Sequence, residues 1–308
     1  MIVGKVYNQL GNQMVMYSAV KSICLDNGLT FKFYVEKIKN EKEINDRGAR
    51  YGREIYTIFE ELKKELVTEA EFDKIEFDYI IEYTEAFSFL RTVNKDANIL
   101  VEHAWSSSVR LFQNRLAEFH DWFKFPDNIL KSCTAIVNKE RLSKEILISV
   151  HFRCGIDYLK GAYQLNYKYW IECGKYLKEK YTGRKIKFFL FYDTGNCFAV
   201  HRFKRKFKGM CYEYGEELAH DMCLMSLCDS HIVCNSTFSV VSALLDSDIS
   251  HIVVRPMNAP CGTGYMKEEL FPNTPNWIVI GKGRRSIGAF IFRGIRILHG
   301  RLVKRKGL

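Results

Sequence analysis

The stretch that decides the fold is residues 145–157, which read EILISVHFRCGID. Its first half is a short apolar run, the pattern of a strand buried inside a parallel sheet. Its second half, from His151 to Asp157, is a polar loop with Arg153 and Gly155 near its centre. Open α/β sheets bind their ligands in loops that directly follow such strands. The stretch therefore predicts an α/β protein with a binding loop at this point.

The residues after this loop continue the alternation of strands and helices. Apolar runs predict strands, and amphipathic segments of helical period lie between them. The predicted strands are 187–192, 231–234 and 251–254, and the predicted helices are 167–180, 219–228 and 237–245. Strands separated by helices of this length predict parallel βαβ units.

The first residues of the chain start a similar series. Residues 2–6 and 30–35 predict strands, and residues 13–26 predict a helix that stops at Asn27 and Gly28. The charged middle of the chain predicts helices around 51–66 and 112–125, with weaker strand signals between them whose order the sequence does not give.

A break at 127–144 separates the two series. We therefore expect an α/β fold of two Rossmann-like halves, residues 1–140 and 141–281, followed by a tail at 282–308.

The composition is that of a folded globular protein. Of 308 residues, 47% are hydrophobic, 27% are charged and only 5 are Pro, which excludes collagen-like and disordered classes. No run of about 18 apolar residues predicts a membrane-spanning helix. Lys5, Asn8 and Gln9 interrupt the apolar start, so we expect no secretory signal.

The net charge of +10 is concentrated in the tail, where 282–308 holds nine Lys and Arg and no acidic residue. The remaining residues carry a net charge of +1, which argues against a nucleic-acid partner. Apolar residues alternate with the charges at helical spacing. The tail is either a helix on an anionic membrane surface or a closing helix docked on its own domain.

The ten cysteines form no Cys-x-x-Cys pair and no cluster with zinc-like spacing. We therefore expect no metal site. Buried free thiols in a reducing cytosol account best for these residues, and this favours a cytoplasmic protein.

Two loops of the second half could bind an anion. Arg153 offers donors that match phosphate oxygens, and Asp157 could accept a proton or bind sugar hydroxyls. The alternative is that Arg153 pairs with Asp157 to hold the loop. Ser236 or Thr237 could expose a helix N-terminus to an anion, or simply cap that helix.

Five segments in order resemble motifs of the α-1,2-fucosyltransferases of glycosyltransferase family 11. Residues 9–14 (QLGNQM) resemble the family's Gly-Gly-Leu-Gly-Asn-Gln-Met opening, and 151–158 resemble its His-x-Arg-Arg-Gly-Asp-Tyr loop. Residues 188–193 (FFLFYD) are similar to its Phe-Phe-x-Phe-Ser-Asp-Asp strand end. Residues 221–228 and 235–239 (NSTFS) match its Asp-x-x-x-Met-Ser-x-Cys and Asn-Ser-Thr-Phe-Ser segments.

The resemblance implies a GT-B fold, with two halves facing a cleft and GDP-fucose held by the second half. It implies inverting transfer of L-fucose from GDP-β-L-fucose to a galactose hydroxyl in α-1,2 linkage, with no metal and no cofactor. The acceptor would be a galactose-containing, lipid-linked oligosaccharide such as an O-antigen unit. The enzyme would then work in the cytoplasm, with its tail on the inner face of the membrane.

The resemblance also implies roles for single residues. The expected catalytic set is Arg153, Asp157 as the base, and His151. The expected donor-binding set is Arg153, Asp193 or Asp221 on guanine, Asn235, Ser236, Thr237 and Ser239. The expected acceptor loop comprises Asn8, Gln9, Gly11, Asn12 and Gln13.

Several positions depart from the family pattern. Cys154 stands at the second Arg, Ile156 is inserted before Asp157, and Val240 and Val241 replace the two Trp residues. Two alternatives therefore stay open. One is a fucosyltransferase of different linkage or acceptor, and the other is a non-catalytic protein that binds a GDP-sugar or a glycan.

Overall fold

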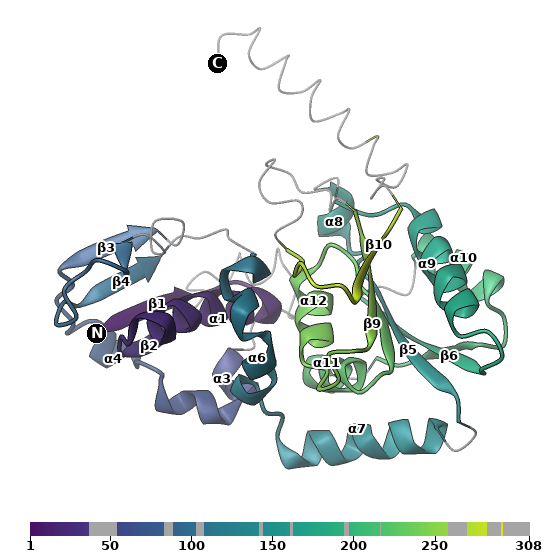
Figure 1. Ribbon diagram of the computed structural model, residues 1–308, viewed down its shortest axis with the longest axis horizontal. Coiled ribbons are helices and arrows are strands. Elements are labelled where there is room, and N and C mark those ends of the chain that lie inside the picture. Colours follow the sequence, from purple (N-terminus) through teal and green to yellow (C-terminus); the bar gives the residue numbers. More distant parts are fainter. Residues whose placement is uncertain are drawn as a thin grey trace, which may run out of the picture. The chain divides into compact units, whose positions relative to one another are not determined.

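The computed structural model describes residues 1–36, 54–82, 89–102, 108–141, 144–160, 163–193, 197–215, 217–257, 270–281 and 291. The chain forms two compact units. Unit 1 is Met1–Leu130 with Glu269–Asn273, and unit 2 is Lys131–Glu268 with Thr274–Leu308. Each unit has helices packed on a parallel sheet, so the predicted mixed α/β architecture is confirmed (Figure 1). Apart from Ile291, the predicted tail lies outside the described residues.

Unit 1 is built on a sheet of four parallel strands in the order β2-β1-β4-β3. The strands are β1 (Ile2–Val6), β2 (Phe31–Val35), β3 (Tyr79–Glu82) and β4 (Ile99–Glu102). The two predicted strands are confirmed as β1 and β2. The short strands β3 and β4 lie in the charged middle region, where no clear period marks them.

The helices of unit 1 are short except for the first. They are α1 (Leu10–Asn27), α3 (Ile55–Ile58), α4 (Glu69–Phe72), α6 (Leu116–Trp122), and the 3-10 helices η2 (Glu60–Lys64) and η3 (Val109–Arg115). Helix α1 ends as predicted at Gly28, whose φ of 62° is left-handed. A continuous helix over 112–125 is wrong, because Phe112 leaves the helical conformation and buries its ring on Phe119.

Unit 2 contains a sheet of six parallel strands in the order β10-β9-β8-β5-β6-β7. The strands are β5 (Ile146–Phe152), β6 (Ile186–Tyr192), β7 (Cys211–Glu213), β8 (Ser230–Ile232), β9 (Ile252–Pro256) and β10 (Trp277–Ile280). All seven residues of β5 are buried, as expected for a central strand.

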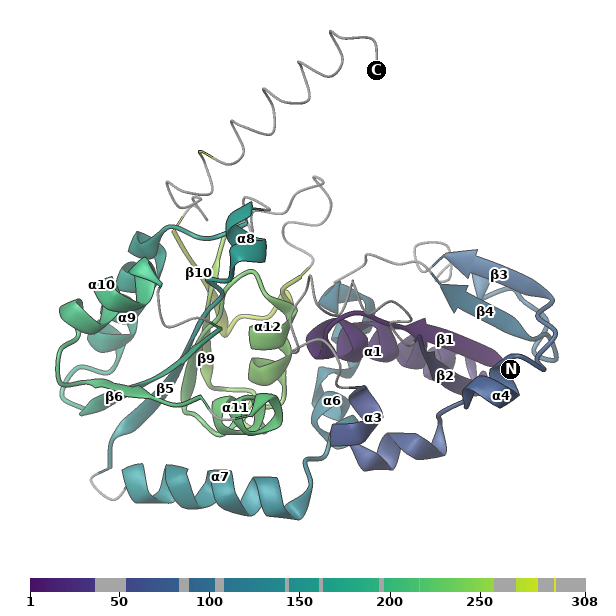
Figure 2. The same ribbon diagram turned by 180° about the vertical axis from the view of Figure 1, so that it is seen from behind.

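The helices of unit 2 cover both faces of this sheet (Figures 1 and 2). Helices α9 (Tyr167–Lys180) and α10 (Phe198–Lys206) lie together on one face, and α11 (Leu218–Ser226) and α12 (Thr237–Leu244) lie on the other. This is the arrangement that right-handed crossovers produce when the chain moves in opposite directions from the middle of the sheet.

Two further helices belong to this part of the chain. Helix α8 (Ile156–Lys160) directly follows the loop after β5. The residues of the predicted break at 127–144 include a helix, α7 (Asp127–Glu140), which buries Cys133 and Val137. Among the described residues, every helix is too short or too polar to span a bilayer.

Close packing joins α9 to α10 in the core of unit 2. Two rings lie against Gly174 of α9: Phe203 of α10 and Phe207, the residue that follows α10. A Cβ added at Gly174 would come within 2.6 Å of the Phe207 ring. On the inner side Trp170 stacks on Phe152 of β5. This packing fixes the end of β5, from which the candidate loop begins.

Candidate functional site

The candidate site lies at the carboxyl edge of the unit 2 sheet. Strands β8, β5 and β6 are neighbours, and all are parallel. Arg153 follows β5, Asp193 follows β6 and Asn235 comes three residues after β8. Parallel strands end at the same edge, so the sheet brings these three predicted residues together.

Asp193 holds the loop that follows β5. Its Oδ1 accepts the backbone N–H of Cys154 at 2.8 Å, and its Oδ2 accepts that of Gly155 at 2.9 Å. The same Oδ2 lies 3.0 Å from Nη1 of Arg153. Asp193 is therefore an ion-pair partner of Arg153. The alternative pairing of Arg153 with Asp157 stays a prediction, because the side chain of Asp157 lies outside the described part of the structure.

The ring of Tyr158 also contacts the Arg153 side chain, and Asn235 holds Tyr158 in place. The guanidinium lies 5.0 Å from the centre of the Tyr158 ring. The Tyr158 hydroxyl donates to the Asn235 carbonyl at 2.9 Å, and the Asn235 side chain donates to the Tyr163 carbonyl, also at 2.9 Å. Arg153 thus contacts Asp193 after β6 and Tyr158 of α8, and Tyr158 is held in turn by Asn235; 15% of the Arg153 side chain is exposed.

A disulfide between Cys154 and Cys197 ties this loop to the residue that precedes α10. This corrects the expectation that the cysteines are free thiols. Gln164 also donates to the Cys154 carbonyl at 3.2 Å. The residue that stands at the family's second Arg is therefore a covalent anchor of the loop.

The 235–239 turn leads into α12. Ser236 is the N-cap residue, but its side chain makes no capping hydrogen bond, and Thr237 begins the helix half-buried. Ser239 is fully buried, donates to the Ser236 carbonyl at 3.0 Å and accepts the Cys234 N–H at 3.2 Å. Ser239 therefore shapes the turn, and Ser236 and Thr237 lie at the N-terminal end of α12, where backbone N–H groups favour anions.

His151 lies within β5, with 6% of its surface exposed. Burial, with a smaller effect from the Arg153 charge, lowers the pKa of its imidazole to about 3. Its Nδ1 lies 3.3 Å from Sγ of Cys234. A neutral, buried imidazole fits a role in packing the strand end better than proton transfer to a substrate.

Asp221 is a residue of α11, one of the helices of unit 2. It lies in the first turn of α11, half-buried, where its charge stabilises the helix N-terminus.

The predicted acceptor loop lies at the carboxyl end of β1 in unit 1. Gln9 is the N-cap residue of α1, and Gly11 and Asn12 are in its first turn. Asn8 has a φ of 75°, and its carbonyl accepts the Gln13 side-chain amide at 2.8 Å.

Gln13 is 3% exposed, and its Oε1 accepts the N–H of Ile55 at 2.9 Å. Gln13 therefore links the Asn8 loop to the start of α3 and does not face solvent.

A cluster of charged residues that the sequence analysis did not predict lies at the carboxyl edge of the unit 1 sheet. Lys5 Nζ is 3.0 Å from a Glu36 oxygen and 3.3 Å from a Glu102 oxygen. Burial, and then the Glu36 charge, raise the pKa of Tyr7 beside them. Glu36 follows β2 and Glu102 ends β4, so the rule that predicted Arg153 in unit 2 could also have found them.

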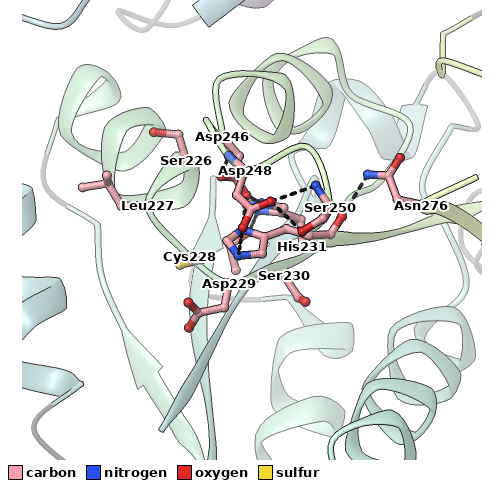
Figure 3. Close-up of polar contacts among 12 residues, drawn as sticks. Ser226, Leu227, Cys228, Asp229, Ser230, His231, Asp246, Asp248, Ser250 and Asn276 are labelled. Atoms are coloured by element: carbon pink, nitrogen blue, oxygen red, sulfur yellow. Dashed lines mark hydrogen bonds and ion pairs between the residues drawn. The ribbon is translucent and has the colours of Figure 1, made fainter. Parts of the chain in front are cut away.

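A chain of serine, histidine and aspartate runs from the middle of the unit 2 sheet toward its amino edge. Ser149 Oγ is 2.8 Å from Nδ1 of His231. His231 Nε2 is 2.9 Å from an oxygen of Asp246 (Figure 3). His251 also bonds Asp246, at 2.6 Å. Ser149 and His231 are fully buried, so no substrate can reach them, and the chain is a structural network rather than a hydrolase triad.

Comparisons with known proteins found no matching protein-family model and no matching curated protein. Solved structures of similar shape include the fucosyltransferase NodZ from Bradyrhizobium, with 15% identity, a TM-score of 0.45 and coverage of 79% of this chain and 92% of that chain. POFUT1 in complex with GDP-fucose has 11% identity, a TM-score of 0.49 and coverage of 82% and 97%. Arabidopsis thaliana FUT1 in complex with GDP has 12% identity, a TM-score of 0.48 and coverage of 91% and 76%. At this similarity, function has to be argued from the residues of the site.

Proposed function

We propose that the protein is a metal-independent, inverting fucosyltransferase that moves L-fucose from GDP-β-L-fucose to a galactose hydroxyl in α-1,2 linkage. The observation that carries this proposal is the fixed Arg153 guanidinium at the carboxyl edge of a parallel sheet. The family motifs that surround it in the sequence supply the identity of the donor and the sugar.

The chemistry requires a cation where the bond to the sugar breaks. When fucose leaves, negative charge develops on the GDP diphosphate, and donors already in place stabilise it best. A guanidinium can donate to two phosphate oxygens while an ion pair holds its orientation. In the proposal Arg153 does this, assisted by Ser236, Thr237 and the N–H groups at the start of α12.

The remaining roles follow from the motif match. Asp157 is proposed as the base that takes the proton of the acceptor hydroxyl. Asn8, Gln9, Gly11 and Asn12 are proposed to face the acceptor from unit 1. The proposed acceptor is a lipid-linked surface glycan, and the basic tail is proposed to bring the enzyme to it by binding the membrane.

The test measures GDP release when the protein is mixed with GDP-fucose and a water-soluble galactoside. Arg153→Lys should lower turnover about 10²–10³-fold, because the planar fork and its donors are lost while the charge remains. Arg141→Lys is the matched control, since Arg141 also pairs with an aspartate of unit 2, Asp229 at 2.7 Å. Unchanged turnover in Arg153→Lys would overturn the proposed role.

A second candidate is a protein that binds GDP-fucose without transferring the sugar. The observation that favours it is Cys154, which replaces the family's second Arg and is bound in a disulfide. Saturable binding of GDP-fucose by calorimetry, with no GDP release for any galactoside offered, would support this candidate over the enzyme.

A further inference from the structure

Residues 1–281 have a net charge of only +1, but they include two strongly charged regions of opposite sign. Residues 167–208 contain 12 Lys and Arg and 3 Asp and Glu, whereas residues 54–82 contain 3 Lys and Arg and 10 Asp and Glu. The first region is the part of unit 2 that includes α9, β6 and α10. The chain therefore carries a concentrated positive charge on one part of one unit.

Helices α9 and α10 place most of this charge on one face of the unit 2 sheet. Their apolar side chains, such as Trp170 and Leu177 of α9 and Phe203 of α10, point into the core and are fully buried. The two helices lie side by side over the sheet in both views (Figures 1 and 2). We call the exposed basic residues of the two helices and of the segments that follow them the basic face: Lys168, Lys175, Lys178, Lys180, Arg184, Lys185, Arg205, Lys206 and Lys208.

Interactions within the fold account for only part of this charge. Lys187 lies 2.8 Å from Glu140 and 2.7 Å from Glu145, and Lys204 pairs with Glu213, so neither is counted in the basic face. The last turns of α9 and α10 favour cations, because helix C-termini carry partial negative charge. Arg184, Lys185 and Lys208 follow the helices, where that effect is lost.

We propose that the basic face of α9 and α10 binds the surface of an anionic lipid bilayer. Each Lys or Arg near such a surface is attracted to the lipid headgroups, and clustered cations add their contributions. This contact is separate from the predicted membrane contact of the tail, and it does not depend on which reaction the protein catalyses.

An exposed aromatic group on the same helix favours lipid over nucleic acid as the partner. Phe198 begins α10 and is 65% exposed, an unusual position for so large an apolar side chain. Its ring lies 5.3 Å from that of Tyr167, and the Arg202 guanidinium covers both rings at 5.1–5.7 Å. Aromatic rings beside basic residues are typical of surfaces that enter the headgroup region of a membrane.

The test compares binding of the full chain to vesicles of phosphatidylcholine alone and of phosphatidylcholine mixed with phosphatidylglycerol. One variant removes four charges of the basic face: Lys178→Gln, Lys180→Gln, Arg205→Gln and Lys206→Gln. The matched control removes four charges from exposed lysines elsewhere: Lys63→Gln, Lys74→Gln, Lys95→Gln and Lys139→Gln. Both variants keep the tail and have the same net charge.

We expect the wild type and the control to bind the anionic vesicles and the basic-face variant to bind at least tenfold less. Each charge contributes about fivefold, so four charges allow a loss of up to several hundredfold. Phe198→Ser should remove most of the binding that persists at high salt, where screening weakens the charges.

Three results would overturn the proposal. They are equal binding by the two variants, no binding of the wild type to anionic vesicles, and displacement of the wild type from vesicles by an equal charge of duplex DNA. Fucosyl transfer to a water-soluble acceptor is measured in parallel, so failure of this proposal is distinct from failure of the proposed function.

Discussion

Removing the disulfide should destabilise unit 2 and loosen the loop of Arg153. Cys154 and Cys197 are 43 residues apart in the sequence. In the chain-entropy model, closing a loop of this length in the unfolded chain stabilises the fold by about 4 kcal/mol. The double variant Cys154→Ser, Cys197→Ser should therefore lower the free energy of unfolding by about that amount, measured by urea denaturation followed by circular dichroism.

The wild type provides its own control for this prediction. A reducing agent should lower the urea midpoint of the wild type toward that of the double variant and leave the variant unchanged. Thiol titration of the denatured wild type should find two more thiols after reduction than before. If the midpoint of the wild type does not respond to reduction and no thiols appear, the covalent link is absent and the reasoning fails.

The same variant tests the functional consequence of the disulfide. Cys154 lies between Arg153 and Gly155, and its N–H is one of the two that bond Asp193. Under the proposed function, the loop without the disulfide has more conformations to lose when GDP-fucose binds, so the KM for GDP-fucose should rise more than kcat falls. The thiol titration bears on location as well, because such bonds are rare in a reducing cytosol.

Two further predictions concern buried polar contacts. The hydrogen bond to Asp246 raises the pKa of His251. The charged imidazole therefore stabilises the fold below about pH 6.5, and this contribution is lost as pH rises through the pKa of the folded state. His251→Asn should flatten the decline of the unfolding free energy between pH 6 and 8. Gln13→Ala should cost about 1–3 kcal/mol of unfolding free energy, because the Ile55 N–H and the Asn8 carbonyl each lose a buried partner. Gln13→Glu should cost more at pH 7, because it buries a carboxylate against the Asn8 carbonyl, and a smaller loss than that of Gln13→Ala would contradict this account.

The sequence predicted best the helices that bury one face and the strands that are buried on both faces. Helix α9 has the predicted bounds, because its apolar residues follow the helical period and Asn166 caps its start by accepting the Lys168 N–H. Helix α7 was missed although Ile129, Cys133 and Val137 recur at helical spacing, so its period was present in the sequence and was overlooked. The disulfide could not be predicted, since spacing alone does not determine which cysteines pair.

The candidate site was predictable in its location and not in its contacts. Each predicted loop of unit 2 follows a strand, and a parallel sheet brings all such loops to one edge. The partner of Arg153 depends on register, which the sequence does not reveal. Phe152 of β5 lies opposite Tyr192 of β6, so the next residue of each strand, Arg153 and Asp193, lie side by side.

This register also explains how one carboxylate can orient the site without blocking it. Asp193 accepts two backbone N–H groups in addition to its contact with Arg153, so its charge stays compensated if the guanidinium shifts toward a ligand. A guanidinium has five donors, and one of its nitrogens can keep Asp193 while others turn to phosphate oxygens. Asp193 is thus better suited to positioning Arg153 and its loop than to recognising guanine. An Asp193→Asn substitution, which keeps the size but loses the charge, would raise the KM for the donor rather than change selectivity between GDP-fucose and its nucleotide analogues.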